Sequence, residues 1–123
     1  MIKMFTKKRK GFTLVELIVV VAILGILVAV AVPRLTNSSQ NAERKAVEAN
    51  LRTINGAISI WQAENTGTLD QAALTNATTG TLKAWPKGPS SATYTIEGGE
   101  AAVTGTVGGK TLSKVVLSDT MWN

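Results

Sequence analysis

The first apolar stretch of the chain runs from Phe12 to Val32 and contains 21 residues with a single charge, Glu16. At a rise of about 1.5 Å per residue, a helix of this length spans roughly 30 Å, the thickness of the hydrocarbon core of a bilayer. The stretch is too long and too apolar for an ordinary buried helix. The pattern therefore predicts a transmembrane helix.

A second helical pattern follows the polar residues 36–41 and has one apolar face. Its apolar residues recur at steps of 4, 3, 4 and 3, as on one side of an α-helix: Val47, Leu51, Ile54, Ile58 and Trp61. The sequence Asn65-Thr66-Gly67 closes the pattern in the manner of a helix C-cap. The two patterns together predict one helix from Phe12 to about Asn65, transmembrane in its first half and amphipathic in its second.

The rest of the chain predicts a small β-rich head. Three β-prone runs cover residues 92–97, 100–107 and 110–117, and the pairs Gly98-Gly99 and Gly108-Gly109 separate them. Two-residue Gly-Gly loops favour hairpin turns. A head of this size buries little core by itself. We therefore expect an α+β fold in which the long helix packs against an antiparallel three-stranded sheet.

The hairpin register follows from the Gly-Gly turns. It places Tyr94 opposite Val103 and Ile96 opposite Ala101, which gives the sheet an apolar face toward the helix. In the last strand, Lys114 falls on this inner face, whereas Val115 and Leu117 fall on the outer one. We expect a bulge or a register shift there, because a single inserted residue reverses the side-chain alternation.

A basic cluster, Lys7-Lys8-Arg9-Lys10, precedes the apolar stretch, and the first charges behind it are Arg34 and a mixed set. The positive-inside rule then leaves the N-terminus in the cytoplasm and exports the remaining residues, about 90 in number. A secretory signal is a poor alternative, because its apolar core is usually shorter and ends at a small-residue cleavage site. A plain transmembrane helix with a stray acid near its end remains open.

Glu16 needs a stabilising partner, because a carboxylate within an apolar segment costs roughly 2.5 to 3.5 kcal/mol on insertion scales. Its position near the helix N-terminus places it at the positive end of the helix dipole. If several such helices leave the lipid and pack together, an unpaired Glu16 destabilises the packed state, and a cation from the neighbouring chain compensates it. We therefore interpret Glu16 as a residue that sets the register between neighbouring helices.

The segment KGFTLVELIVVVAILGIL (residues 10–27), with the basic residues before it and Pro33 behind it, resembles the class III signal of type IV pilins and pseudopilins. The resemblance covers about the first 45 residues. It implies that a membrane aspartyl peptidase cuts between Gly11 and Phe12 and that the same enzyme N-methylates Phe12. Glu16 matches the acidic position of the family, while Gly25 and Pro33 match its helix-breaking positions.

The resemblance divides the chain into four parts: a cleaved leader (residues 1–11), a transmembrane and filament-core helix (12–33), its amphipathic continuation (34–65) and a β-rich head (66–123). Gly25 and Pro33 weaken the helix between them, because glycine has low helix propensity and proline removes a backbone donor. We expect this segment to bend or unwind.

Charge has to be counted without the leader. The chain carries 13 basic and 8 acidic residues, and five of the basic ones precede Phe12, so eight basic residues face eight acidic ones in the processed chain. The net charge of +5 therefore gives no evidence for a nucleic-acid-binding face. The absence of His and Cys excludes a histidine-based triad, a thiol nucleophile, a zinc site and the disulfide of many Gram-negative pilins. We expect no catalytic residue, metal or cofactor.

The resemblance implies a non-enzymatic subunit of a type IV pilus, stored in the bacterial inner membrane and then assembled into an extracellular homopolymer for adhesion, motility or DNA uptake. Its partners are other copies, the prepilin peptidase, and an assembly platform with a separate ATPase. The main alternative is a pseudopilin of a type II secretion or competence system. The major pseudopilins generally carry an acid-rich calcium loop, a pattern that the tail does not contain. A minor tip pilin and a monomeric membrane-anchored binding module are further alternatives.

Overall fold

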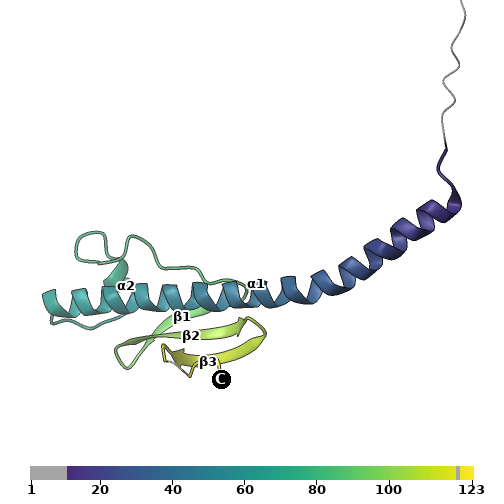
Figure 1. Ribbon diagram of the computed structural model, residues 1–123. Coiled ribbons are helices and arrows are strands. Elements are labelled where there is room, and N and C mark those ends of the chain that lie inside the picture. The colour runs from purple at the N-terminus through teal and green to yellow at the C-terminus, as the bar shows by residue number, and fades with distance from the viewer. Residues whose placement is uncertain (1–10, 119) are drawn as a thin grey trace, which may run out of the picture. The chain divides into compact units, whose positions relative to one another are not determined.

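The computed structural model describes residues 11–118 and 120–123, so residues 1–10, which hold the basic cluster and most of the predicted leader, lie outside the described residues. The elements in chain order are α1 (Leu14–Glu64), α2 (Gln71–Thr75), β1 (Thr93–Glu97), β2 (Glu100–Val107) and β3 (Lys110–Val116) (Figure 1). The fold is α+β, as the sequence predicts. The chain forms two compact units, residues 1–36 and 37–123, which are described separately below.

The described part of the first unit is the beginning of α1 and the three residues before it. The helix begins at Leu14, two residues after the predicted start, and remains helical through Gly25 and Pro33. Its large apolar side chains, from Phe12 to Leu35, are all at least half exposed. Residues 25–33 are helical throughout, so the unwinding expected between Gly25 and Pro33 is not present in this single chain. A bend there stays a prediction.

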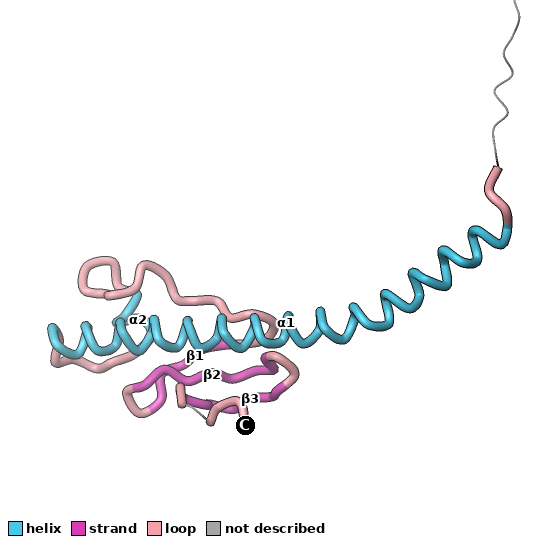
Figure 2. Tube along the Cα trace, viewed as in Figure 1, coloured by secondary structure: helices cyan, strands magenta, loops and turns pink. Residues whose placement is uncertain are grey.

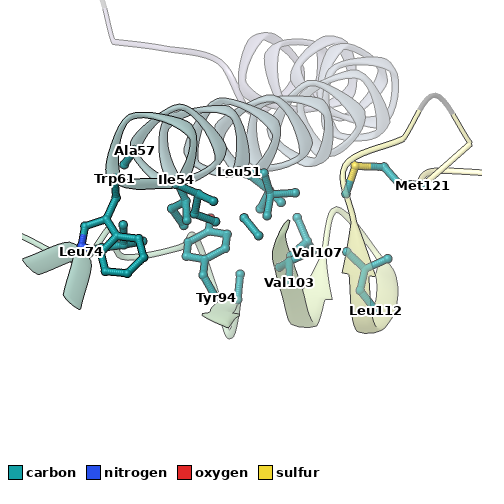
Figure 3. Close-up of a cluster of buried hydrophobic side chains, with 14 residues drawn as sticks. Leu51, Ile54, Ala57, Trp61, Leu74, Tyr94, Val103, Val107, Leu112 and Met121 are labelled. Atoms are coloured by element: carbon teal, nitrogen blue, oxygen red, sulfur yellow. The ribbon is translucent and has the colours of Figure 1, made fainter. Parts of the chain in front are cut away.

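In the second unit, α1 packs its apolar face on the sheet. All five residues of the predicted stripe are buried: Val47, Leu51, Ile54, Ile58 and Trp61. Figure 3 shows Leu51 and Ile54 directed toward Val103 and Tyr94 of the sheet. Ala57 is buried with them, although a small residue between stripe positions gives little signal in the sequence. The core therefore lies between one helix face and one sheet face.

The sheet has the predicted order and register. Its strands lie in the order β1-β2-β3, both pairs are antiparallel, and Tyr94 pairs with Val103 and Ile96 with Ala101. All four glycines of the two Gly-Gly turns have positive φ, as the tight hairpin turn requires of both central residues. The turns therefore fix the register that places the apolar residues toward α1.

The bulge predicted for the last strand is present. Val103 pairs with Val115 and Gly105 with Leu112, so two residues of β3 lie opposite one residue of β2. Lys114, one of these two residues, has a φ of 50° and is exposed. The extra residue turns Lys114 away from the core and brings Val115 into contact with it.

Polar side chains of α1 hold the sheet at both hairpin turns. Asn55 Oδ1 accepts a 2.7 Å hydrogen bond from the backbone N–H of Ala101, just after the first turn. At the second turn, Glu43 Oε2 accepts from the N–H of Gly108 at 2.8 Å, and Arg44 Nη2 donates to the Gly108 carbonyl at 2.8 Å. Both ends of β2 are therefore anchored to the helix.

The loop between α2 and β1 runs alongside α1 (Figure 2). Three hydrogen bonds tether it at positions seven residues apart on the helix: Thr81 Oγ1 to the Ala57 carbonyl, Asn50 Nδ2 to the Lys87 carbonyl, and Ser90 Oγ to Glu43 Oε1. Because seven residues are about two helical turns, the tethers lie on one side of α1. The loop thus covers a second strip of the helix.

Candidate processing and assembly site

The predicted processing point lies in the irregular segment just before α1. Gly11, Phe12 and Thr13 have no helical or strand structure, and all three are exposed. The Phe12 side chain is 87% exposed, and a Cβ built on Gly11 meets nothing within 4 Å. The peptide bond between Gly11 and Phe12 is therefore not covered by the described part of the chain.

Thr13 and Glu16 form reciprocal hydrogen bonds at the start of α1. Glu16 Oε2 accepts from the backbone N–H of Thr13 at 2.9 Å and from the Thr13 hydroxyl at 3.1 Å. In return, the Glu16 N–H donates to Thr13 Oγ1 at 3.2 Å. This arrangement is a capping box, in which the residue before the helix and the third helical residue each satisfy a free backbone donor of the other.

The capping box shows how a single chain satisfies the carboxylate of Glu16. Both hydrogen bonds to this carboxylate fall on the same oxygen, Oε2. A carboxylate has about four lone-pair positions, so it retains the capacity to accept from a further donor such as an ammonium group. The geometry thus allows Glu16 to be satisfied within its own chain and also to bind a cation from outside.

Thr13 is the functional candidate that the sequence reasoning missed. The signal was present, because Thr13-Leu14-Val15-Glu16 has the T-x-x-E spacing of a capping box immediately before an apolar helix. The interpretation of Glu16 considered only the Phe12 ammonium, of the same chain or of a neighbour, as its partner and left Thr13 out.

The other predicted site residues do not join this cluster. Gly25 and Pro33 lie 9 and 17 residues beyond Glu16 on the same helix, which is about 14 and 26 Å at the helical rise. A Cβ built on Gly25 meets nothing within 4 Å, so close packing within the chain does not require a glycine there. Within residues 11–118 and 120–123, no group of three His, Cys, Asp or Glu side chains is placed to hold a metal ion.

The described chain contains one helix, α1, with a segment long and apolar enough to cross a membrane by length and composition. The apolar side chains of this segment are exposed rather than packed in a core. The segment therefore does not resemble the buried core helix of a soluble protein.

Comparison with known proteins identifies the segment. Residues 6–32 match the family model described as the prokaryotic N-terminal methylation motif. The chain is 35% identical over 109 residues to the type IV narrow pilus major component PilA5 of Thermus thermophilus, a match that covers 85% of this chain and 92% of that protein. The chain belongs to the type IV pilin and pseudopilin family.

Other relatives of this pilin-family chain match it over shorter regions. The type II secretion system core protein G of Klebsiella pneumoniae is 36% identical over 59 residues, which are 48% of this chain and 42% of that protein. The ComG operon protein 3 homolog of Bacillus licheniformis is 31% identical over 58 residues, which are 47% of this chain and 60% of that protein. No solved structure matches the chain significantly. As a member of this family, the chain is a structural subunit and not an enzyme.

Proposed function

We propose that the chain is the structural subunit of an extracellular type IV pilus. The observation that carries this proposal is the extent of the match to PilA5, which covers 92% of that pilus component, whereas the match to the secretion protein G covers 42% of that protein. A match that extends over most of both chains includes the β-rich head as well as the helix. The similarity of the head therefore favours the role of a pilus component over that of a secretion protein.

Prepilin peptidase cleaves the precursor between Gly11 and Phe12 and methylates the new Phe12 amine in this proposal. Two observations support it. The methylation-motif model spans the predicted cleavage point, and residues 11–13 form an exposed segment outside helix and strand directly before α1. An exposed segment outside the helix can enter a peptidase active site without unwinding the helix that follows it.

The helix of residues 12–33 anchors the subunit in the inner membrane before assembly, with the head, residues 66–123, outside the cytoplasm. Its exposed apolar surface requires lipid or other apolar helices around it, because water solvates such a surface poorly. The basic cluster Lys7-Lys8-Arg9-Lys10 supports this orientation. In the filament, copies of the same helix replace the lipid and form the core, joined by the amphipathic residues 34–65.

Glu16 pairs with the Phe12 ammonium of a neighbouring subunit during assembly. In the free subunit, the capping box with Thr13 satisfies its carboxylate, so storage in the membrane does not leave this charge without a partner. In the packed core, a neighbour's ammonium adds a charge-assisted hydrogen bond. The assembly platform and a cytoplasmic ATPase supply the work, and the filament serves adhesion, motility or DNA uptake.

The test begins with filaments sheared from the cell surface. Cryo-electron microscopy and mass spectrometry should find this chain beginning at methylated Phe12. Glu16→Ala should lose most filaments while the precursor is still cleaved after Gly11, and Gln62→Ala, which changes an exposed polar residue near the far end of α1, is the control. Normal filament yield in Glu16→Ala contradicts the role of Glu16.

A pseudopilin is the second candidate, and the matches to secretion protein G and to ComG operon protein 3 favour it. In that case, wild-type cells shed no filament that contains this chain, and the processed subunit stays in the cell envelope. Shearing filaments from the cell surface and looking for this chain among them therefore distinguishes the two functions.

A further inference from the structure

A groove of about 780 Å³ lies between α1 and the residues that follow β3. We call it the Trp122 groove, and it is lined by Lys45, Glu48, Arg52, Leu117, Ser118 and Trp122. The indole Nε1 of Trp122 donates a 2.7 Å hydrogen bond to Glu48 Oε1, which fixes the aromatic ring against the helix. This hydrogen bond fixes one wall of the groove, which is formed jointly by α1 and the residues after β3.

The Trp122 groove is electropositive. The side chains of Lys45 and Arg52 are 78% and 70% exposed, whereas that of Glu48 is 14% exposed. The guanidinium of Arg44, which is not part of the lining, lies 5.5 Å from the centre of the Trp122 ring. Two cations of the lining thus accompany one carboxylate, which is already hydrogen-bonded to Trp122 and to Lys45. The lining has an excess of one positive charge for an incoming acidic group.

The opposite end of the same unit is acidic. We call it the acidic end, and it consists of Glu64, Asp70, Glu97 and Glu100. Glu64 is the last residue of α1, and Glu97 and Glu100 flank the β1–β2 turn. A Cβ built on Gly99 of that turn would lie 3.7 Å from Gln62, which places the turn beside the last turn of α1.

Most of the acidic end lacks a basic partner in its own chain. Glu97 pairs with Lys114 at 2.9 Å. Among residues 11–118 and 120–123, Glu64, Asp70 and Glu100 have no basic side chain within 4.0 Å. These three acids remain available to cations from another molecule.

Glu64 cannot pair with the cations of the Trp122 groove within one chain. Arg52 and Glu64 are 12 residues apart on a continuous helix, or about 18 Å, and Lys45 and Glu64 are 19 residues apart, or about 28 Å. Both separations exceed the Debye length of roughly 8 Å at physiological salt. Only another molecule can bring Glu64 to Arg52 or Lys45.

We propose that the Trp122 groove binds the acidic end of a second copy of the same chain. The inference rests on the proposed filament and specifies one of its contacts. Because the groove and the acidic end are different surfaces, the contact is heterologous and can repeat from copy to copy along a filament. Pairing of Glu64 with Arg52 or Lys45 requires that the two copies be offset along the helix axis by about 18 to 28 Å. Exposed ion pairs contribute little energy each, so this contact sets register and salt sensitivity rather than most of the stability.

Engineered cysteines test this contact directly, because the chain contains no cysteine of its own. We would express full-length subunits that carry Arg52→Cys with Glu64→Cys, or Lys45→Cys with Glu64→Cys, and oxidise whole cells. A disulfide within one chain is excluded, since its Cα atoms must lie within about 7 Å of each other. The expected result is a ladder of covalent dimers, trimers and longer oligomers on non-reducing gels.

The matched control carries Lys83→Cys with Glu64→Cys, because Lys83 is an exposed lysine of the same unit outside the Trp122 groove. Single-cysteine variants control for random oxidation. Surface filaments without any ladder, or an equally strong ladder in the control, overturn the inference and leave the proposed function intact. A specific ladder in cells that shed no filament supports the inference and contradicts only the surface pilus.

A charge exchange tests the same contact without cross-linking. Arg52→Glu gives a subunit with acidic groups on both surfaces, and Glu64→Lys weakens the acidic end, so each variant alone should lose assembled subunits and become more sensitive to salt. Both substitutions in one chain, or the two variants expressed together, restore an oppositely charged partner and should recover assembly. Lys83→Glu is the control for net charge.

Two results of the charge exchange overturn the proposal. One is a loss in Arg52→Glu that neither combination repairs, although the subunit is processed and accumulates as the wild type does. The other is normal assembly of Arg52→Glu filaments that bind duplex DNA less well than the wild type, which would assign the Trp122 groove to nucleic acid.

Discussion

Trp122 and Glu48 are 74 residues apart in the chain and are joined by a 2.7 Å hydrogen bond from the indole Nε1 to the carboxylate Oε1. Lys45 Nζ donates to the other oxygen of Glu48 at 3.2 Å. The Trp122 bond is the largest cause of a lowered pKa of Glu48, with Lys45 and Arg52 as smaller causes that oppose the effect of burial. The folded head therefore favours the ionised form of Glu48.

This relationship predicts a stability that falls in acid. Because the folded pKa of Glu48 lies below its ordinary value of 4.5, the unfolded chain binds more protons between the two values, and stability rises with pH there. The contribution of Glu48 is complete above the ordinary pKa and is lost as the pH falls through the lowered one. Thermal unfolding of the detergent-solubilised subunit from pH 7 to below pH 4, followed by tryptophan fluorescence, measures it.

Glu48→Gln is the control for this pH dependence, because its amide oxygen still accepts from Trp122 but does not titrate. We expect the Tm of this variant to depend less steeply on pH below about 4.5 than the Tm of the wild type. Equal slopes in the two proteins would show that other carboxylates cause the acid sensitivity.

Helix α1 offers a matched pair of isoleucines, one on its buried face and one on its exposed face. Ile54 is 0% exposed in the core, while Ile60 is 54% exposed on the same helix. Ile54→Ala leaves a cavity and should lower the free energy of unfolding of the head by about 2 to 5 kcal/mol. Ile60→Ala should change it by about 0.5 kcal/mol or less. Denaturation of the subunit in detergent checks both, and similar losses would mean that the exposed face contributes as much as the core.

The sequence predicts this core well because its signals are local. The 3.6-residue period of α1 and the two-residue period of the strands are visible within short windows, and the Gly-Gly pairs then fix which strand residues lie opposite each other. The bulge in β3 was predictable for the same reason. Lys114 conflicts with the alternation of its own strand, and only an extra residue turns it outward.

The contacts that depend on the path of the whole chain were not predictable. Nothing near Trp122 in the sequence indicates that it lies against Glu48, and nothing near Gly108 indicates that Glu43 and Arg44 bind its backbone. Both contacts require the helix and the sheet to be docked first. The resemblance predicts Gly11, Phe12 and Glu16 as the candidate site from the sequence alone, whereas the Trp122 groove appears only in the folded unit.

Substitution by alanine should have opposite effects on stability at two glycines, Gly105 and Gly56. Gly105 has a φ of 131°, and a Cβ built on it would lie 2.4 Å from the backbone oxygen of Ser91. Gly105→Ala should therefore destabilise the head through both clash and backbone strain. Gly56 lies in the helix with open space around its position, so Gly56→Ala should stabilise it by up to about 1 kcal/mol. The two Tm shifts should have opposite signs, and two shifts of equal sign would contradict the geometry.

The capping box at the start of α1 predicts a local effect of Thr13. Thr13→Ala removes the hydroxyl that accepts from the Glu16 N–H and donates to its carboxylate. Loss of such a cap typically costs about 0.5 to 2 kcal/mol of helix stability. The amides of the first turn should therefore exchange hydrogen faster in detergent micelles. Thr13→Ser keeps the hydroxyl and should restore the wild-type exchange rates.

The same substitution separates the two roles of Glu16. Thr13→Ala loosens the helix start but leaves the carboxylate, which can still bind a neighbour's ammonium, whereas Glu16→Ala removes the capping carboxylate and the assembly partner together. Filament yield should therefore fall less in Thr13→Ala than in Glu16→Ala, with equal amounts of processed subunit in the membrane. An equal loss in both variants would mean that assembly depends on the capping box itself, because a carboxylate without its orienting threonine would then be insufficient.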